Sequence, residues 1–341
     1  MKIAVDAMGG DYAPVEIVKG AIRAAHEYKG AEIILIGKAP LLHVLAGRQI
    51  KKLGISVVHA EQNIEFHEHP MEALRQKPDS PIPIGIGLLK EGKADVFISA
   101  GSTGAIFAAS LVMLGKIEGV SRPAIASIMN LSHSLLPTLL LDAGANADCR
   151  PPHLVQFAQL GNLYASRIFG LESPRIGLLS NGAEETKGNR LTVESHQLLR
   201  QSGLNFIGNI EGNDLVNDVA DVIVTDGFTG NILLKALEGL GESIVHIHGG
   251  EKAHTTGNPR ITGKALSSAV GLSSFLRKID YSEFGGGCLL GVRGNVIICH
   301  GRSKAKAIKN AIGIANHTAE RGIAQALSEV KYEPGEDRPD A

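Results

Sequence analysis

The chain has no tryptophan, few aromatic residues and almost no net charge. Aromatics make up 4% of its 341 residues, and 34 basic against 35 acidic side chains give a formal net charge of -1. Nucleic-acid-binding domains usually carry a clear excess of basic residues, and proteins that bind unpaired bases usually stack them on aromatic side chains. The composition therefore argues against a protein dedicated to nucleic-acid binding.

Cysteine is scarce as well. The three cysteines, Cys149, Cys288 and Cys299, form no CxxC pair and are odd in number. That usage is typical of a reducing cytosol rather than of a disulfide framework. An apolar strand is expected from Lys2 onward, which leaves no room for a signal peptide before it, and no apolar run reaches about 18 residues. We expect a cytoplasmic protein with no membrane-spanning segment.

Two nucleotide-binding motifs are also absent from the sequence. No GxGxxG loop is followed by a ribose-binding acid about 20 residues later, and no GxxxxGK[ST] loop occurs. A nicotinamide-dependent dehydrogenase and a P-loop nucleotide-binding protein are therefore not indicated, and we expect no cofactor.

Short apolar runs alternate with helix-like stretches along most of the chain. The runs are KIAVD, EIILIG, ISVVHA, DVFISAG, TLLLDAG, RIGLLSNG, ADVIVTDG and NVIICHG, and helices are expected near 14–25, 103–114, 151–169, 189–201, 229–247 and 303–327. Continuous apolar strands that alternate with helices predict a mostly parallel sheet covered on both faces. We expect one α/β domain over 1–328, built as a three-layer α/β/α sandwich.

Two segments depart from this alternation. Residues 249–260 are typical of a turn and 261–279 of a second helix, so a protruding helical hairpin is expected over about 230–279. The polar segment 329–341 contains prolines, and we expect it to be a disordered tail.

Glycine, present 41 times, gathers where the expected strands end. The loops read DAMGGD, SAGSTGA, LDAGAN, SNGAEETKGN, TDGFTGN and CHGRS. Ligands of open α/β sheets bind beyond the carboxyl ends of the strands, and glycine lets backbone N–H groups approach an anion closely. A glycine can also simply end a strand, but six such loops on one expected edge favour a small anion or a phosphorylated group as the ligand.

Polar residues in these loops are the candidate site residues. Lys187, His300 and Asn231 are the candidate catalytic residues, and the candidate phosphate-binding positions are Gly9, Gly10, Ser102, Thr103, Gly104, Asn146 and Gly230. The strand-end acids Asp6, Asp11, Asp142 and Asp226 would repel an anion, so we expect them to fix loop geometry or to orient a cation such as Lys187. A metal site built from these acids is the competing interpretation, and we expect no metal.

Many longer motifs occur together and in a fixed order. They are KIAVDAMGGDYAP, PMEALRQK, EGKADVFISAGSTGA, LLLDAGANADC, HLVQFAQLGNLYA, KGN, ADVIVTDGFTGN, DYSEFGGGCLLGVRG and HGRSKAKAIKNAI. From Lys2 to about Ala315, the chain resembles the bacterial phosphate acyltransferases of phospholipid synthesis, which make acyl phosphate from acyl-acyl carrier protein.

The resemblance implies a function and a set of partners. It implies transfer of a long-chain fatty acyl group from acyl carrier protein to inorganic phosphate, in a homodimer whose fold is like that of isocitrate and isopropylmalate dehydrogenases. It also implies that the acyl phosphate feeds a membrane-bound glycerol-3-phosphate acyltransferase, and that the hairpin contributes to the dimer and to transient, peripheral membrane contact. No nucleic acid is expected as a partner.

Four positions depart from the family pattern. Ser102 replaces an asparagine, SNGAEE around Gly182 replaces NIGEE, Cys288 replaces a proline, and Arg302 replaces a serine. We expect these positions, interpreted as loop residues beside the site, to affect acyl-chain preference and phosphate contacts rather than the class of reaction.

The chemistry implied needs no protein nucleophile. Phosphate already carries an ionised oxygen at neutral pH, and thiolate is a good leaving group. Positioning can lower the barrier by up to ~7–11 kcal/mol, and each well-placed oxyanion donor by ~3–4 kcal/mol. We expect Lys187 and loop amides to supply these effects, with Gly9 and Gly10 bringing the backbone close to the phosphate or the oxyanion.

Alternatives remain open at this point. Cys149, with His153 four residues later, is a candidate acyl-enzyme nucleophile, although a small packed cysteine is commoner. Coenzyme A could replace the carrier protein as the donor, or the protein could be a non-catalytic regulator that binds a phosphorylated metabolite. For an acidic carrier protein we expect a basic docking surface, and the candidates are Arg260, Lys264, Arg277 and Lys278.

Overall fold

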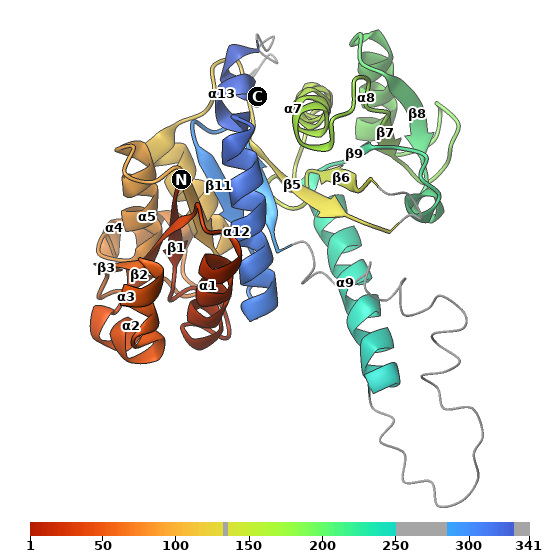
Figure 1. The fold of residues 1–341 in the computed structure, drawn as a ribbon. Coiled ribbons are helices and arrows are strands. Elements are labelled where there is room, and N and C mark those ends of the chain that lie inside the picture. Colours follow the sequence, from red (N-terminus) through yellow and green to blue (C-terminus); the bar gives the residue numbers. More distant parts are fainter. Residues whose placement is uncertain (132–135, 250–284, 331–341) are drawn as a thin grey trace, which may run out of the picture.

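The computed structural model describes residues 1–131, 136–249 and 285–330 (Figure 1). One eleven-stranded sheet has the order β3-β2-β1-β4-β11-β10-β5-β6-β9-β7-β8. The strands are β1 (Lys2–Asp6), β2 (Glu32–Gly37), β3 (Ser56–His59), β4 (Val96–Ser99), β5 (Ala124–Met129), β6 (Thr138–Leu141), β7 (Ile176–Leu179), β8 (Phe206–Ile210), β9 (Val222–Val224), β10 (Gly287–Leu290) and β11 (Asn295–Ile298).

Helices cover both faces of this sheet. They are α1 (Val15–Glu27), α2 (Ala39–Ala46), α3 (Gln49–Leu53), α4 (Pro70–Gln76), α5 (Pro81–Lys90), α6 (Thr103–Ala109), α7 (Pro151–Phe169), α8 (Arg190–Gln201), α9 (Gly227–Gly249), α12 (Ala305–Glu320) and α13 (Ile323–Glu329). A π-helical turn, η1 (Ser110–Leu114), continues α6, and a 3-10 turn, η2 (Gly212–Val216), follows β8.

Two apolar layers separate the sheet from its helices. Because side chains alternate along a strand, Ile3 and Val5 of β1 enter one layer while Ala4 enters the other. The first layer also takes buried residues from α1, α7, α8, α12 and α13, and the second takes them from α4, α5 and α6, with leucines of α9 packed against it. The predicted three-layer α/β/α sandwich is confirmed.

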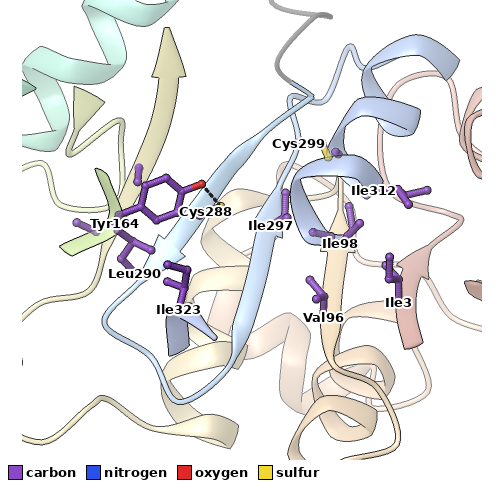
Figure 2. Packing of buried hydrophobic residues seen from close by; sticks show 14 of the residues in the cluster. Ile3, Val96, Ile98, Tyr164, Cys288, Leu290, Ile297, Cys299, Ile312 and Ile323 are labelled. Atoms are coloured by element: carbon purple, nitrogen blue, oxygen red, sulfur yellow. Dashed lines mark hydrogen bonds between the residues drawn. The ribbon is translucent and has the colours of Figure 1, made fainter. Parts of the chain in front are cut away.

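Cys288 lies in the first apolar layer rather than in a loop. Cys288, which the sequence placed in a loop beside the site, lies within β10 and pairs with Ala126 of β5. Its sulfur lies 3.4 Å from the Tyr164 hydroxyl in the layer that includes Ile3, Ile98 and Ile297 (Figure 2). The expectation of a loop position was wrong, because β10 begins at Gly287, one residue before Cys288.

The direction of the strands reverses in the middle of the sheet. All pairings from β3 to β11 are parallel, and so are those from β6 to β8. The three intervening pairings, β11 with β10, β10 with β5 and β5 with β6, are antiparallel. The sheet is mostly parallel, as predicted, but its two parallel halves run in opposite directions.

This reversal corrects the expectation that six glycine loops share one edge. The loops after β1, β4 and β11 lie at the carboxyl edge of one half, and those after β6, β7 and β9 at the carboxyl edge of the other half. The strands responsible, β5 and β10, were not predicted, because AIASIM and GCLL lack the long apolar runs of their neighbours.

The C-terminal helix also differs from expectation. A single helix was expected over 303–327, but α12 ends at Glu320 and α13 begins at Ile323, because Gly322 between them takes a φ of +62° that ends the first helix. The expected helix at 229–247 is confirmed as α9, whereas the second hairpin helix and most of the expected tail lie outside the described residues. Within the described ranges, no helix is long and apolar enough to cross a membrane.

Candidate active site

A cavity of about 380 Å³ lies against the second apolar layer, where the two halves of the sheet meet. Its walls come from β5, from the loops after β4, β6 and β11, from the first residues of β10 and from α9. Its apolar lining includes Ile125, Ile128, Met129, Leu131, Leu234 and Leu237, and its polar lining includes Thr103, Ser127, Asn130, Asn231, Lys235, Glu238 and His300. An apolar wall beside a polar one suits an amphipathic ligand.

A stagger along β5 brings loops from the two opposed halves to one cavity. Its first residues pair with β10 and its last residues pair with β6. The carboxyl end of β6 therefore lies beside the middle of the sheet, where the N–H of Ile125 donates to Asp142 at 3.0 Å and the N–H of Ala143 donates to Ile125 at 2.8 Å. As a result, Ala143 and Gly144 line the same cavity as Gly101 and His300.

The Asp6 carboxylate organises the loops after β1 and β4. It accepts hydrogen bonds from the N–H groups of Met8 and Gly9, both at 2.9 Å, and from the Ser99 hydroxyl at 2.6 Å. Ser99 Oγ in turn accepts the N–H of Gly101 at 3.0 Å, and Gly101 lines the cavity. Burial raises the pKa of Asp6, while these three hydrogen bonds act in the opposite direction.

Gly9 and Gly10 are used for close packing rather than as cavity lining. A Cβ on Gly9 would lie 2.5 Å from Asp6 Oδ2 and 2.7 Å from the nitrogen of Gly101. Gly10 has a φ of +106°, and a Cβ there would lie 3.1 Å from the oxygen of Gly301. The two glycines let the loops after β1, β4 and β11 touch, and neither lines the cavity.

Asp142 organises the turn after β6 in a similar way. Its carboxylate is fully buried and accepts from the backbone N–H groups of Ile125, Gly144, Ala145 and Asn146 and from the Asn146 amide, at 2.7 to 3.1 Å. Burial raises its pKa, yet five N–H donors favour the ionised form. Asn146 also donates to the oxygen of Pro123 at 2.8 Å, and it packs behind the cavity rather than lining it.

Asp226 caps the first turn of α9. Its carboxylate accepts the N–H of Thr229 at 2.8 Å and the hydroxyl of Thr229 at 2.7 Å, which satisfies helix donors that would otherwise lack partners. Gly230 follows, and a Cβ there would overlap the carbonyl oxygen of Asp142. The capped turn therefore packs against the Asp142 loop and sets the position of Asn231, which contacts Gly144 at the cavity.

His300 and Glu238 lie side by side on the polar wall of the cavity. His300 follows β11, and Glu238 lies on α9, with His300 Nε2 at 3.4 Å from Glu238 Oε2. His300 Nδ1 accepts the N–H of Arg302 at 3.1 Å, which assigns the imidazole proton to Nε2. The pair joins the two halves of the molecule at the polar wall.

Of the remaining candidates, only Thr103 lines the cavity. Ser102 caps α6, accepting the N–H of Ala105 at 3.4 Å, and Gly104 packs against Pro70. The N–H of Asp11 donates to Gly301 at 2.8 Å.

Lys187 lies away from the cavity lining. It is exposed in the loop between β7 and α8, where its N–H donates to Glu184 at 3.0 Å and its side chain packs over Gly182. The structure thus brings Asn231, His300 and Thr103 together and leaves Lys187 on the loop after β7, none of whose residues lines the cavity. The proposed docking residues Arg260, Lys264, Arg277 and Lys278 lie outside the described residues.

Lys235 and Glu238 were not predicted as site residues from the sequence. Both follow Asn231 on α9 at spacings of four and seven residues, which places them on the same face of the helix. The signal was present, because a helix that starts beside a candidate site residue presents further side chains to that site at these intervals.

The geometry gives no support to Cys149 as a nucleophile. Burial and the nearby Asp142 carboxylate raise the pKa of the thiol to about 12, so it stays protonated at neutral pH. His153 Nδ1 accepts the N–H of Arg150 at 3.1 Å at the start of α7, so this nitrogen is not available to the thiol as a base. Cys149 does not line the cavity.

In the part of the chain that the structure describes, no three acidic, histidine or cysteine side chains lie close enough together to hold a metal ion.

Comparisons with known proteins give the family. The profile of the family described as "Fatty acid synthesis protein" matches residues 1–326. A phosphate acyltransferase of Dehalococcoides mccartyi is 56% identical over 330 residues, covering 96% of this chain and 94% of its relative. One from Desulforamulus reducens is 49% identical over 333 residues, covering 96% and 97%.

Among solved structures, a phosphotransacetylase from Streptococcus pyogenes has a TM-score of 0.58 and covers 94% of both chains, and at 20% identity it shows the shared fold alone. The two close relatives and the family profile cover nearly the whole sequence. The chain therefore belongs to the phosphate acyltransferases, within the fatty acid synthesis protein family.

Proposed function

We propose that this protein transfers a long-chain fatty acyl group from acyl carrier protein to inorganic phosphate and releases acyl phosphate. The observation that carries the proposal is the cavity, in which an apolar wall from β5 and α9 adjoins a polar wall from Thr103, Asn231 and His300. An acyl chain matches the first wall, and phosphate with the thioester carbonyl matches the second. Close relatives are named phosphate acyltransferases, which supports acyl transfer to phosphate.

The reaction balances without a protein nucleophile. An oxygen of HPO₄²⁻ attacks the thioester carbonyl carbon and forms a tetrahedral oxyanion. The oxyanion collapses, the carbon–sulfur bond breaks, and the thiolate leaves with its electron pair. The proton of the phosphate ends on the thiolate sulfur, so that the products are acyl phosphate and the carrier thiol.

The chain's own residues supply position and hydrogen bonds. Asn231 Nδ2 and the Thr103 hydroxyl are donors for phosphate or for the oxyanion, and His300 Nε2, which lies 3.4 Å from Glu238 Oε2, is proposed to exchange this partner for the ligand. Asp6 and Asp142 hold the loops that position these donors. Lys187, on the loop after β7, is proposed as a cation that approaches the phosphate when both substrates are bound.

The proposal includes partners beyond the two substrates. We propose that the enzyme acts as a homodimer and docks the acidic carrier protein on Arg260, Lys264, Arg277 and Lys278. We also propose transient peripheral association with the membrane, where the acyl phosphate is passed to a membrane-bound glycerol-3-phosphate acyltransferase. The apolar character of acyl phosphate supports such a hand-over, because a released acyl chain would otherwise be exposed to water.

The test compares two donors with and without phosphate. Purified protein is incubated with palmitoyl-acyl carrier protein or palmitoyl-coenzyme A, and loss of thioester is followed together with formation of palmitoyl phosphate. We expect phosphate-dependent turnover of the carrier-protein donor, reduced in Asn231→Ala and in Lys187→Ala. Preference for the coenzyme A donor would overturn the carrier-protein assignment, and phosphate binding without turnover of either donor would indicate a regulator instead.

A further inference from the structure

Lys235 is a cationic side chain on the cavity wall. It lies on α9 one turn after Asn231, and both residues line the cavity. Residues four apart on a helix share a face, so the lysine stands beside the proposed catalytic amide. Among the described residues that line the cavity, Lys235 is the one side chain with a permanent positive charge.

None of the residues that the structure describes neutralises the charge of Lys235. Within the described parts of the chain, its ammonium group takes part in no ion pair or hydrogen bond, and its side chain is exposed. The nearby carboxylate of Glu238 is instead 3.4 Å from His300. Lys235 is thus a cation available to a ligand, with three N–H donors on a flexible stem.

The polar wall needs such a cation if it is to hold phosphate. Glu238 places a carboxylate on the same wall, and like charges repel strongly in a partly desolvated cavity. The Nε2 atom of His300 already lies 3.4 Å from the Glu238 carboxylate. Lys187 does not line the cavity, so it cannot offset the Glu238 charge there in this arrangement.

We propose that Lys235 is the residue that binds the phosphate substrate in this cavity, an inference that rests on the proposed acyl transfer to phosphate. Lys235 would then be the charged contact of the phosphate substrate and not of the acyl donor. The same ammonium group could otherwise contact the phosphodiester of a carrier-bound pantetheine arm, and the experiment separates these two sources of a phosphate group.

The experiment measures binding of inorganic phosphate alone and turnover separately. Phosphate is titrated by calorimetry into wild type, Lys235→Ala, Lys235→Arg and the control Lys52→Ala, which removes the same charge from the exposed end of α3. KM is then measured for phosphate and for palmitoyl-acyl carrier protein. Far-UV circular dichroism and thermal melting check that each variant is folded.

We expect Lys235→Ala to weaken phosphate binding and to raise the KM for phosphate by about 10- to 100-fold, as for the loss of a hydrogen bond to a charged group. The KM for the acyl donor should not change, Lys235→Arg should recover much of the binding, and Lys52→Ala should match wild type. A normal phosphate affinity in Lys235→Ala would overturn the inference, and so would a rise confined to the KM for the donor.

The two proposals fail in distinguishable ways. If wild type binds phosphate but turns over neither thioester, the proposed function is wrong. The calorimetry still tests whether Lys235 binds phosphate. If turnover is normal and Lys235→Ala binds phosphate normally, the inference is wrong and the proposed function stands.

Discussion

At the scale of single residues, the hydrogen-bond partners of a polar side chain decide whether it is available to a substrate or stabilises its own loop. Asp6, Asp142 and Asp226 lie at strand ends beside the cavity, yet their oxygens are taken up by N–H and O–H donors of their own loops. These carboxylates are thus bound within their own loops, and the role of each acid in turnover is still a prediction.

A cysteine substitution separates direct attack by phosphate from an acyl-enzyme route. Since burial and Asp142 raise the pKa of Cys149 to about 12, we expect Cys149→Ala to retain its turnover and Cys149 to react slowly with iodoacetamide at neutral pH. Steady-state rates and intact-mass measurements after incubation with the acyl donor check this. A loss of several orders of magnitude, or an acylated protein, would point to a covalent intermediate.

A glycine substitution tests the contact between the first two loops. The Cβ of Gly9→Ala would lie 2.5 Å from Asp6 Oδ2, and overpacking of this kind typically costs about 1–3 kcal/mol of unfolding free energy. We expect that loss in urea unfolding, together with reduced turnover because the Gly101 loop shifts. The matched control is Gly30→Ala, where nothing lies within 4 Å of the added methyl group, and equal effects of the two variants would refute the packing role.

Side chains that directly follow a strand could be located at the cavity from the sequence, and their roles there are still predictions. His300 and Thr103 were found because they end or follow apolar runs, and both line the cavity. Lys235 was missed because it lies on the third turn of a helix, and Lys187 was favoured because it lies between two glycines. Loop composition shows where a backbone can bend, but it does not show which way the loop faces.

At the scale of elements, the loop that carries Phe66 is held at the cavity mouth by one ion pair. Lys77 Nζ lies 2.6 Å from Glu68 Oε2 and donates to the oxygen of Asn63 at 2.7 Å. Glu68 also accepts the N–H of Glu65 at 2.7 Å. These contacts tie the loop to the end of α4, and Phe66 reaches the cavity lining beside Gly301.

The Lys77–Glu68 ion pair should make the free energy of unfolding depend on pH in one direction. The hydrogen bond from Lys77 lowers the pKa of Glu68 below its ordinary value of 4.5. A lowered pKa means that the stabilisation is present above pH 4.5 and is lost as the pH falls through the folded-state value. We expect wild type to exceed Glu68→Gln in unfolding free energy at neutral pH, with the gap closing below that range in urea titrations.

Loosening the loop that carries Phe66 should also change substrate binding. Lys77→Ala should raise the KM for the acyl donor more than the KM for phosphate, because the mouth rather than the polar wall is loosened. Lys90→Ala on α5 removes an exposed charge and serves as the control. An unchanged KM for the donor would show that the Phe66 loop takes no part in donor binding.

At the scale of the whole molecule, the reversal of strand direction determines where the cavity lies. Three antiparallel pairings around β10 and β5 turn one parallel half against the other, and the stagger along β5 brings both sets of loops together. Individual strands and the layered architecture could be predicted from apolar runs. The reversal could not, because pairing partners and directions are set by packing between segments far apart in sequence.

The central claim is that acyl transfer to phosphate takes place in this cavity. The most direct test is the rate of palmitoyl phosphate formation from palmitoyl-acyl carrier protein and phosphate by Ser127→Phe, whose ring would fill the cavity from β5. Ser328→Phe, on the exposed side of α13, is the control. We predict that Ser127→Phe remains folded and loses most of its activity while Ser328→Phe keeps it, whereas wild-type rates in folded Ser127→Phe would place the reaction elsewhere.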